Sequence, residues 1–248
     1  MMKKIILIVL GLWMMNGVIA QPPKGAIAFY KKGLIQRDKG MYPEAMRSFK
    51  QATILYKKYD SAWLEMGNLS IKLNSIDTAI LYYKKAIVAN PRQPLAYTAM
   101  GNLYRDNKSN TDSALQCYFN AMKIDSTDKL TFYNLAWCYN AKKAYDSAII
   151  YAIRALDIDN NYRQAYGELA HAYHYSPYHA SNKYKEAIEQ FKKNASRSEV
   201  DLPLYYAGMC YMEIKQKDGA LEMVEALKKI GSKMAESLQK RIDMKKDW

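Results

Sequence analysis

The sequence predicts an all-α protein, an α-solenoid of about six helix-turn-helix repeats that ends in a C-terminal capping helix. Small and large residues recur about every 34 residues along most of the chain. Within each recurrence the apolar positions lie three or four residues apart, which is the spacing of one helix face rather than of a strand. The composition agrees, because 50% of the 248 residues are hydrophobic and only 11 are glycine and seven proline.

Residues 1–20 are expected to be a secretory signal peptide. Lys3 and Lys4 precede an apolar run from Ile5 to Ala20, which ends in small residues that suit cleavage. We therefore expect export to a periplasm or to the extracellular space. An uncleaved membrane anchor is the alternative, although the run is short for a membrane span and contains Asn16. Under this alternative, membrane association would occur through this segment only.

Six repeats follow a short linker of residues 21–25. Position 8 of every repeat holds a small residue, an alanine opens the second helix, and a large residue usually follows four positions later. Two helices can approach closely where small side chains meet, and large side chains then fill the surrounding space. The predicted repeats are residues 26–59, 60–93, 94–128, 129–162, 163–200 and 201–234, with Gly33, Gly67, Gly101, Ala136, Ala170 and Gly208 at position 8.

The second repeat resembles the tetratricopeptide repeat, a pattern of 34 residues with a tryptophan, a Leu-Gly pair, two alanines and a closing proline. The matching residues are Trp63, Met66-Gly67, Ala79, Tyr83, Ala86 and Pro91. Ser70 stands where the pattern has a tyrosine. The other repeats extend the resemblance over residues 26–234. The resemblance implies stacked helical hairpins whose first helices line a concave surface.

Local features modify the regular repeat. One extra residue near Asn110 lengthens the third repeat, and about five around Ser176-Pro177-Tyr178-His179 lengthen the turn of the fifth. Residues 235–248 are predicted to form a capping helix and a basic tail, with one buried stripe of Met234, Leu238 and Ile242. Four aspartates are expected just before second helices, where they suit free N–H groups: Asp77, Asp112, Asp146 and Asp218.

Composition narrows the possible functions. The formal charge of +13 can attract nucleic acid, anionic lipid or an acidic protein. Export argues against nucleic acid, so a helical-repeat RNA-binding protein is a less favoured alternative. No catalytic motif such as G-x-S-x-G or H-E-x-x-H occurs, so we expect neither an enzyme nor a cofactor. Cys138 and Cys210 occupy position 10, which is apolar in the other repeats, and are expected to be small buried residues.

The resemblance further implies a groove that binds a polypeptide through positions 2, 5, 6, 9 and 12 of the first helices. Amides there can hydrogen-bond a bound backbone, and aromatic residues can anchor it. Trp137 is the favoured anchor, with packing against a neighbouring repeat as an equal alternative. The groove candidates are Asn68, Asn102, Arg105, Tyr133, Asn134, Trp137, Asn140, His171, His174 and Tyr205, together with Met209.

Two other uses of these residues are less favoured. His171 and His174 could chelate a metal, but no carboxylate or cysteine completes a set of three or four ligands, so no metal site is predicted. A clamp for a C-terminal carboxylate would need basic residues where Leu64 and Thr98 stand. The sequence thus predicts an adaptor or scaffold that binds a protein or peptide in a bacterial cell-envelope process. The alternative is an assembly factor anchored by its N-terminal segment.

Overall fold

The computed structural model describes residues 21–106, 109–176, 181–196 and 201–248, which form α-helices joined by short turns. This described part contains 13 helices and no strand, which confirms the predicted all-α class. The expected signal peptide, residues 1–20, lies outside the described residues, as do Pro177, Tyr178 and His179 of the lengthened turn. Among the described helices, none combines the length and the apolar character needed to cross a bilayer.

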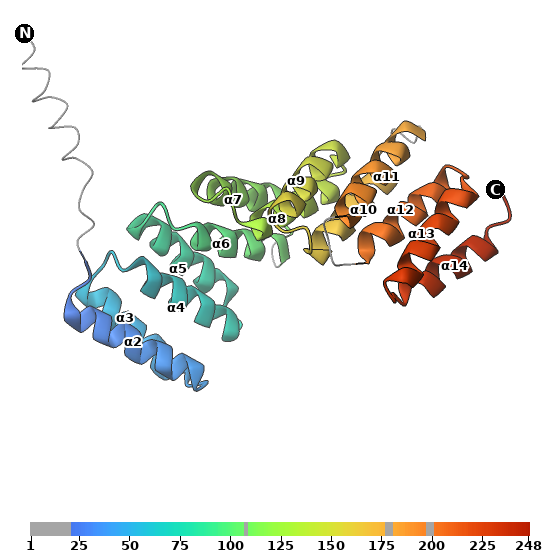
Figure 1. The fold of residues 1–248 in the computed structure, drawn as a ribbon. Coiled ribbons are helices and arrows are strands. Elements are labelled where there is room, and N and C mark those ends of the chain that lie inside the picture. Colours follow the sequence, from blue (N-terminus) through green and yellow to red (C-terminus); the bar gives the residue numbers. More distant parts are fainter. Residues whose placement is uncertain (1–20, 107–108, 177–180, 197–200) are drawn as a thin grey trace, which may run out of the picture. The chain divides into compact units, whose positions relative to one another are not determined.

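The chain forms two compact units, and the first extends to Pro91. Unit 1 consists of two antiparallel helical hairpins, drawn in blue and blue-green in Figure 1. In each hairpin the two helices pack along their length, and α3 also contacts α4, so the second hairpin stacks on the first. The helices are α2 (Lys24–Asp38), α3 (Tyr42–Leu55), α4 (Asp60–Lys72) and α5 (Ile76–Ala89).

Unit 2 begins at Arg92 and continues the same construction. Helix α6 packs on α7, α8 on α9 and α12 on α13, while α7 contacts α8 and α9 contacts α10. The last helix, α14, packs against α12 and α13, as expected of a capping helix. The helices are α6 (Pro94–Asp106), α7 (Thr111–Ile124), α8 (Lys129–Ala141), α9 (Tyr145–Ile158), α10 (Arg163–Tyr175), α11 (Ser181–Ala195), α12 (Leu202–Glu213), α13 (Lys217–Lys229) and α14 (Met234–Met244).

The small residue at position 8 lets a ring of the second helix lie directly on the first helix. A Cβ atom added to Gly33 would lie 2.6 Å from the Phe49 ring, closer than side-chain atoms approach one another. The same arrangement occurs three times, in the pairs Gly33–Phe49, Gly67–Tyr83 and Gly101–Tyr118. The expected matching of small against large side chains is therefore present in both units.

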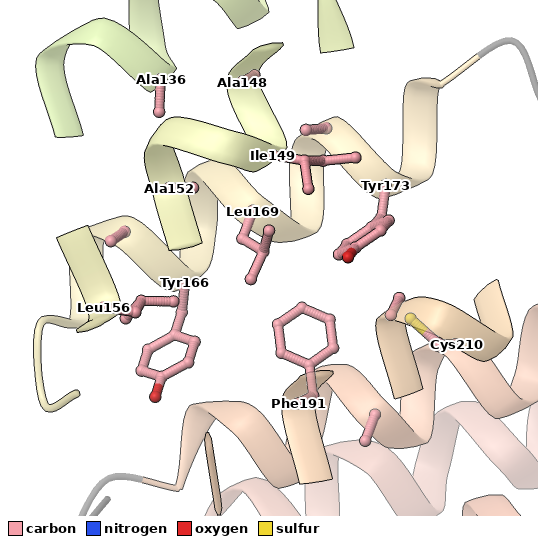
Figure 2. Packing of buried hydrophobic residues seen from close by; sticks show 14 of the residues in the cluster. Ala136, Ala148, Ile149, Ala152, Leu156, Tyr166, Leu169, Tyr173, Phe191 and Cys210 are labelled. Atoms are coloured by element: carbon pink, nitrogen blue, oxygen red, sulfur yellow. The ribbon is translucent and has the colours of Figure 1, made fainter. Parts of the chain in front are cut away.

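The size of the buried side chains in unit 2 differs between hairpins, as Figure 2 shows. In the α8–α9 hairpin Ala136 and Ala152 are both fully buried, so an alanine stands where α3, α5 and α7 have an aromatic ring. Further along, Leu169 of α10 and Phe191 of α11 point toward each other, and both are fully buried. These side chains form part of the limited apolar contact between α10 and α11, whose helices otherwise touch little.

The positions of the four aspartates and of the cysteines can be compared with the predictions from the sequence. The four aspartates expected before second helices are instead the second residues of those helices, where they still favour the positive helix end. In α7 the capping residue is Asn110, whose side chain accepts a hydrogen bond from the Ser113 N–H at 3.0 Å. Cys138 and Cys210 are buried, as predicted, and burial raises the pKa of each to about 12.

Candidate partner-binding site

The asparagines predicted for the groove form hydrogen bonds within the protein. In unit 1 the Tyr83 hydroxyl donates to Asn68 Oδ1 at 2.8 Å. In unit 2 the Tyr118 hydroxyl donates to Asn102 Oδ1 at 2.7 Å, and the Asn134 amide donates to the same oxygen at 3.3 Å. These amides therefore join the two helices of a hairpin, and Asn134 also joins α8 to α6.

Asn140 has a similar structural environment. It is buried, and its amide donates to the backbone oxygen of Glu168 at 2.9 Å and to its carboxylate at 2.7 Å. This pair of bonds fastens α8 to α10. Asn140 thus faces the following repeat, and little of its surface is open to a partner.

Trp137 lies partly exposed beneath the side chain of Arg105, whose guanidinium carbon is 5.3 Å from the ring centroid. Arg105 also donates to Asn134 Oδ1 at 2.5 Å and pairs with Asp106, and this pairing raises the pKa of Arg105. Tyr133 lies beside them, and burial raises the pKa of its hydroxyl. Trp137 therefore packs against a neighbouring repeat while keeping part of its ring available to a partner.

The remaining groove candidates meet in one pocket of unit 2. His171 and His174 of α10 lie opposite Tyr205 and Met209 of α12, around a cavity of about 450 Å³. Aromatic side chains dominate its wall. The full lining is Gly167, Ala170, His171, Tyr173, His174, Tyr175, Tyr184, Tyr205, Tyr206, Met209, Cys210, Glu213 and Arg241. We call this cavity the tyrosine pocket.

The tyrosine pocket lies beside a hairpin whose two helices make few contacts with each other. Helices α10 and α11 make few contacts with each other, whereas α11 packs closely on α12. Ala170, the small residue at position 8, is only partly buried, although its counterparts in the other repeats are buried. A Cβ atom added to Gly167 would meet nothing within 4 Å. The unfilled space thus belongs to the repeat whose sequence is longer by about five residues.

The pocket also carries a polar group without a protein partner. The Tyr173 hydroxyl is buried and forms no hydrogen bond with the described residues. Burial raises the pKa of Tyr173, and the neighbouring Glu186 carboxylate adds to the shift. Glu213 and Arg241 bring one negative and one positive side chain to the lining. The arrangement suits an apolar or aromatic group that offers a hydrogen-bond acceptor or donor to Tyr173.

Sequence reasoning found four lining residues and missed the others. Gly167 occupies position 5, one of the groove positions, and its lack of a side chain was a detectable sign of open space. Tyr184 and Arg241 come from α11 and α14, which the resemblance does not assign to the groove. Their participation depends on how α11 and α14 pack around α12, and the repeat pattern does not contain that information.

The two histidines form aromatic contacts. The His171 ring centroid lies 4.6 Å from that of Tyr175, and the His174 centroid lies 4.7 Å from the same ring. Among the described residues there is no group of three or more His, Cys, Asp or Glu side chains placed to hold a metal ion. The geometry therefore supports a packing or partner-contact role for these histidines.

The sequence is similar to tetratricopeptide-repeat proteins. The family model described as tetratricopeptide repeat matches residues 60–93 and 131–162. A photosystem I assembly protein, Ycf3 of Prochlorococcus marinus (strain MIT 9301), is 30% identical over 97 residues. That alignment covers 38% of this chain and 56% of Ycf3, so the chain spans about half the length of this relative.

Solved structures share the fold at low sequence identity. The structure described as YrrB, a TPR protein with an unusual peptide-binding site, has a TM-score of 0.57 at 22% identity and covers 77% of this chain and 97% of its own. PilW, described as a widely conserved type IV pilus biogenesis factor, has a TM-score of 0.57 at 18% identity and covers 88% of this chain and 99% of its own. These similarities establish a fold built from repeated helical hairpins.

Proposed function

This chain is a tetratricopeptide-repeat protein, and we propose that it is a scaffold that binds a polypeptide partner, with the tyrosine pocket of unit 2 as the anchoring site. Repeat proteins of this type serve as protein-interaction scaffolds, and the relatives named above are assembly factors and repeat proteins rather than enzymes. Catalysis is not part of the proposal.

The tyrosine pocket is the observation that carries the proposal. It has the volume of a large side chain or more, and tyrosine side chains provide contact area at a small conformational cost. No described residue bonds the buried Tyr173 hydroxyl, so a ligand or a water can supply its hydrogen bond. We propose that the partner inserts an aromatic or large apolar side chain beside Tyr205 and directs a polar group toward Tyr173.

Filling the pocket tests this proposal. Gly167→Leu places a side chain in the open space and replaces a helical glycine with a better helix former, so the fold should be retained. Partner capture by a photo-crosslinking residue in place of Gln164, an exposed groove position outside the pocket, should fall about tenfold or more if the lost contact is worth about 1.4 kcal/mol. Captured proteins would be identified by mass spectrometry.

The matched control adds the same side chain to a second helix of unit 2, outside the groove positions. Gln116 is exposed on α7 and does not line the cavity, so Gln116→Leu should leave capture unchanged. Equal capture by the wild-type chain and the Gly167→Leu variant would contradict the proposal. Asn102→Ala is a poorer test, because it removes the partner of the Tyr118 hydroxyl and would weaken the hairpin itself.

We also propose that the scaffold acts in a bacterial cell-envelope process after export. Support comes from the signal-like pattern of residues 1–20 and from the fold shared with the pilus biogenesis factor PilW. A mature N-terminus at Gln21, read by mass spectrometry of the protein from cells, is the expected result. A retained N-terminal segment would instead favour the membrane-anchored assembly factor.

A further inference from the structure

Unit 1 carries a second hollow that includes none of the predicted groove residues. It has a volume of about 350 Å³ and lies between the turn after α3, the start of α4 and one face of α5. Lys57 and Lys58 come from the turn, Trp63 from α4, and the remaining lining residues from α5. We call it the lysine hollow.

The apolar part of the lysine hollow is exposed. Leu81 is 51% exposed and Val88 is 82% exposed, and the seven-residue spacing places both on one face of α5. Trp63 lines the same hollow and is held in place, because its Nε1–H donates to the Lys57 carbonyl at 2.9 Å and its ring stacks on Tyr82 with centroids 5.9 Å apart. A partner that covers these side chains would remove apolar area from water.

The rim of the hollow is positive. Four lysines contribute to it, and none of them forms an ion pair with another described residue: Lys57, Lys58, Lys84 and Lys85. The Lys85 ammonium lies 4.8 Å from the Trp63 ring centroid, a cation–π contact that orients it above the apolar floor. Residues 21–91 contain 12 Lys and Arg against five Asp and Glu, so the surrounding unit reinforces the positive field.

Charge selects among the possible occupants. The N-terminal segment of residues 1–20 contains two lysines and no acidic residue, so it does not complement the rim. A second copy of a chain with a formal charge of +13 would be repelled on approach. An anionic bilayer has the right charge but presents a flat surface, whereas a hollow with an aromatic floor is shaped for a single inserted side chain.

We propose that the lysine hollow binds an acidic segment of a partner polypeptide, which inserts one large apolar side chain over Trp63 while its carboxylates pair with the surrounding lysines. The segment's apolar side chain would cover Leu81 and Val88. This surface is separate from the tyrosine pocket, and its binding can therefore be lost or retained independently of the function proposed above.

The test uses a short fluorescein-labelled peptide in which glutamates flank one phenylalanine, and binding to the full chain is followed by fluorescence anisotropy. The triple variant Lys57→Glu, Lys58→Glu, Lys84→Glu should weaken binding by about tenfold or more, because three surface pairs are replaced by like charges. Raising the salt concentration should weaken binding to the wild-type chain as well. Val88→Ser should weaken it by a few-fold, since the side chain is exposed and its loss leaves the fold intact.

The matched control changes the same net charge elsewhere in unit 1. Lys31, Lys39 and Lys72 are exposed and do not line the hollow, so their combined replacement by glutamate should change binding by less than about twofold. Equal losses in the two triple variants would show a diffuse charge effect and overturn the proposal. Absence of peptide binding would overturn it too, as would binding to phosphatidylserine vesicles that requires the hollow's lysines and is not displaced by the peptide.

Discussion

Gly67 in unit 1 and Gly167 in unit 2 both lie inside first helices, yet their surroundings are opposite. The Tyr83 ring covers Gly67 so closely that an added Cβ would lie 2.6 Å from its Cδ1 atom. An added Cβ on Gly167 would have no neighbour within 4 Å. The α4–α5 hairpin is closed over its glycine, whereas α10 and α11 touch little.

The difference shows that a glycine in a first helix can have two roles. It can let a neighbouring ring pack against the helix, or it can leave a space unfilled. At Gly67 the glycine is required because the ring occupies the place of a side chain. At Gly167 no packing contact requires it, and a helical glycine costs about 1 kcal/mol relative to alanine. The open space at Gly167 borders the tyrosine pocket, so the absence of a side chain there leaves room for a bound group.

The largest expected effect comes from removing the ring that closes the unit 1 hairpin. Tyr83→Ala should lower the free energy of unfolding by about 3–5 kcal/mol, because it empties a fully buried site between α4 and α5. Urea unfolding followed by circular dichroism measures the change. Leu81→Ala is the control on the same helix and should stay within about 0.5 kcal/mol, because this side chain is half exposed. Similar losses for the two variants would mean that the Tyr83 ring does not hold the hairpin together.

A smaller loss is expected when a methyl group is forced under the ring. Gly67→Ala should destabilise the protein by about 1–3 kcal/mol through overpacking, although alanine is the better helix former. The melting temperature is the simplest measurement. A variant as stable as the wild type would show that Tyr83 can move aside easily, and the packing requirement at Gly67 would be withdrawn.

Removing only the tyrosine hydroxyl should lower the free energy of unfolding by a still smaller amount, and by different amounts in the two units. Tyr83→Phe takes away the hydrogen bond to Asn68, and Tyr118→Phe takes away that to Asn102, each worth about 0.5–1.5 kcal/mol. Asn102 Oδ1 keeps the Asn134 amide as a donor, so Tyr118→Phe should be the milder change. Denaturant midpoints of the two variants decide the order, and a milder Tyr83→Phe would contradict it.

The repeat framework could be predicted from the sequence because it depends on residue size at fixed spacing. The helices α4, α6, α8 and α10 begin at Asp60, Pro94, Lys129 and Arg163, where four of the repeats were predicted to begin. Size patterns of this kind are local, since both partners of a hairpin contact lie within one repeat. That is why the glycine–ring pairs were visible before the structure.

The use of the polar residues could not be predicted in the same way. The repeat pattern placed Asn68 in the groove and Tyr83 in the second helix of the same hairpin. However, an amide at position 9 can hydrogen-bond either a partner or the tyrosine of its own hairpin. The choice depends on the distance between the helices, which the spacing does not give. The tyrosine pocket was missed for a related reason, because it needs Tyr184 and Arg241 from helices outside the groove set.

The smallest expected effect has the opposite sign and concerns Gly167. Gly167→Ala should raise the free energy of unfolding by about 0.5–1 kcal/mol, because alanine lowers the entropy cost of forming α10 and its methyl group meets no atom within 4 Å. The denaturant midpoint should rise with an unchanged slope. The same substitution at Gly67 should lower it, so the pair of alanine variants compares the two glycines directly. A loss of stability at Gly167 would mean that the space beside it is needed for packing, and the binding role of the tyrosine pocket would lose its main structural argument.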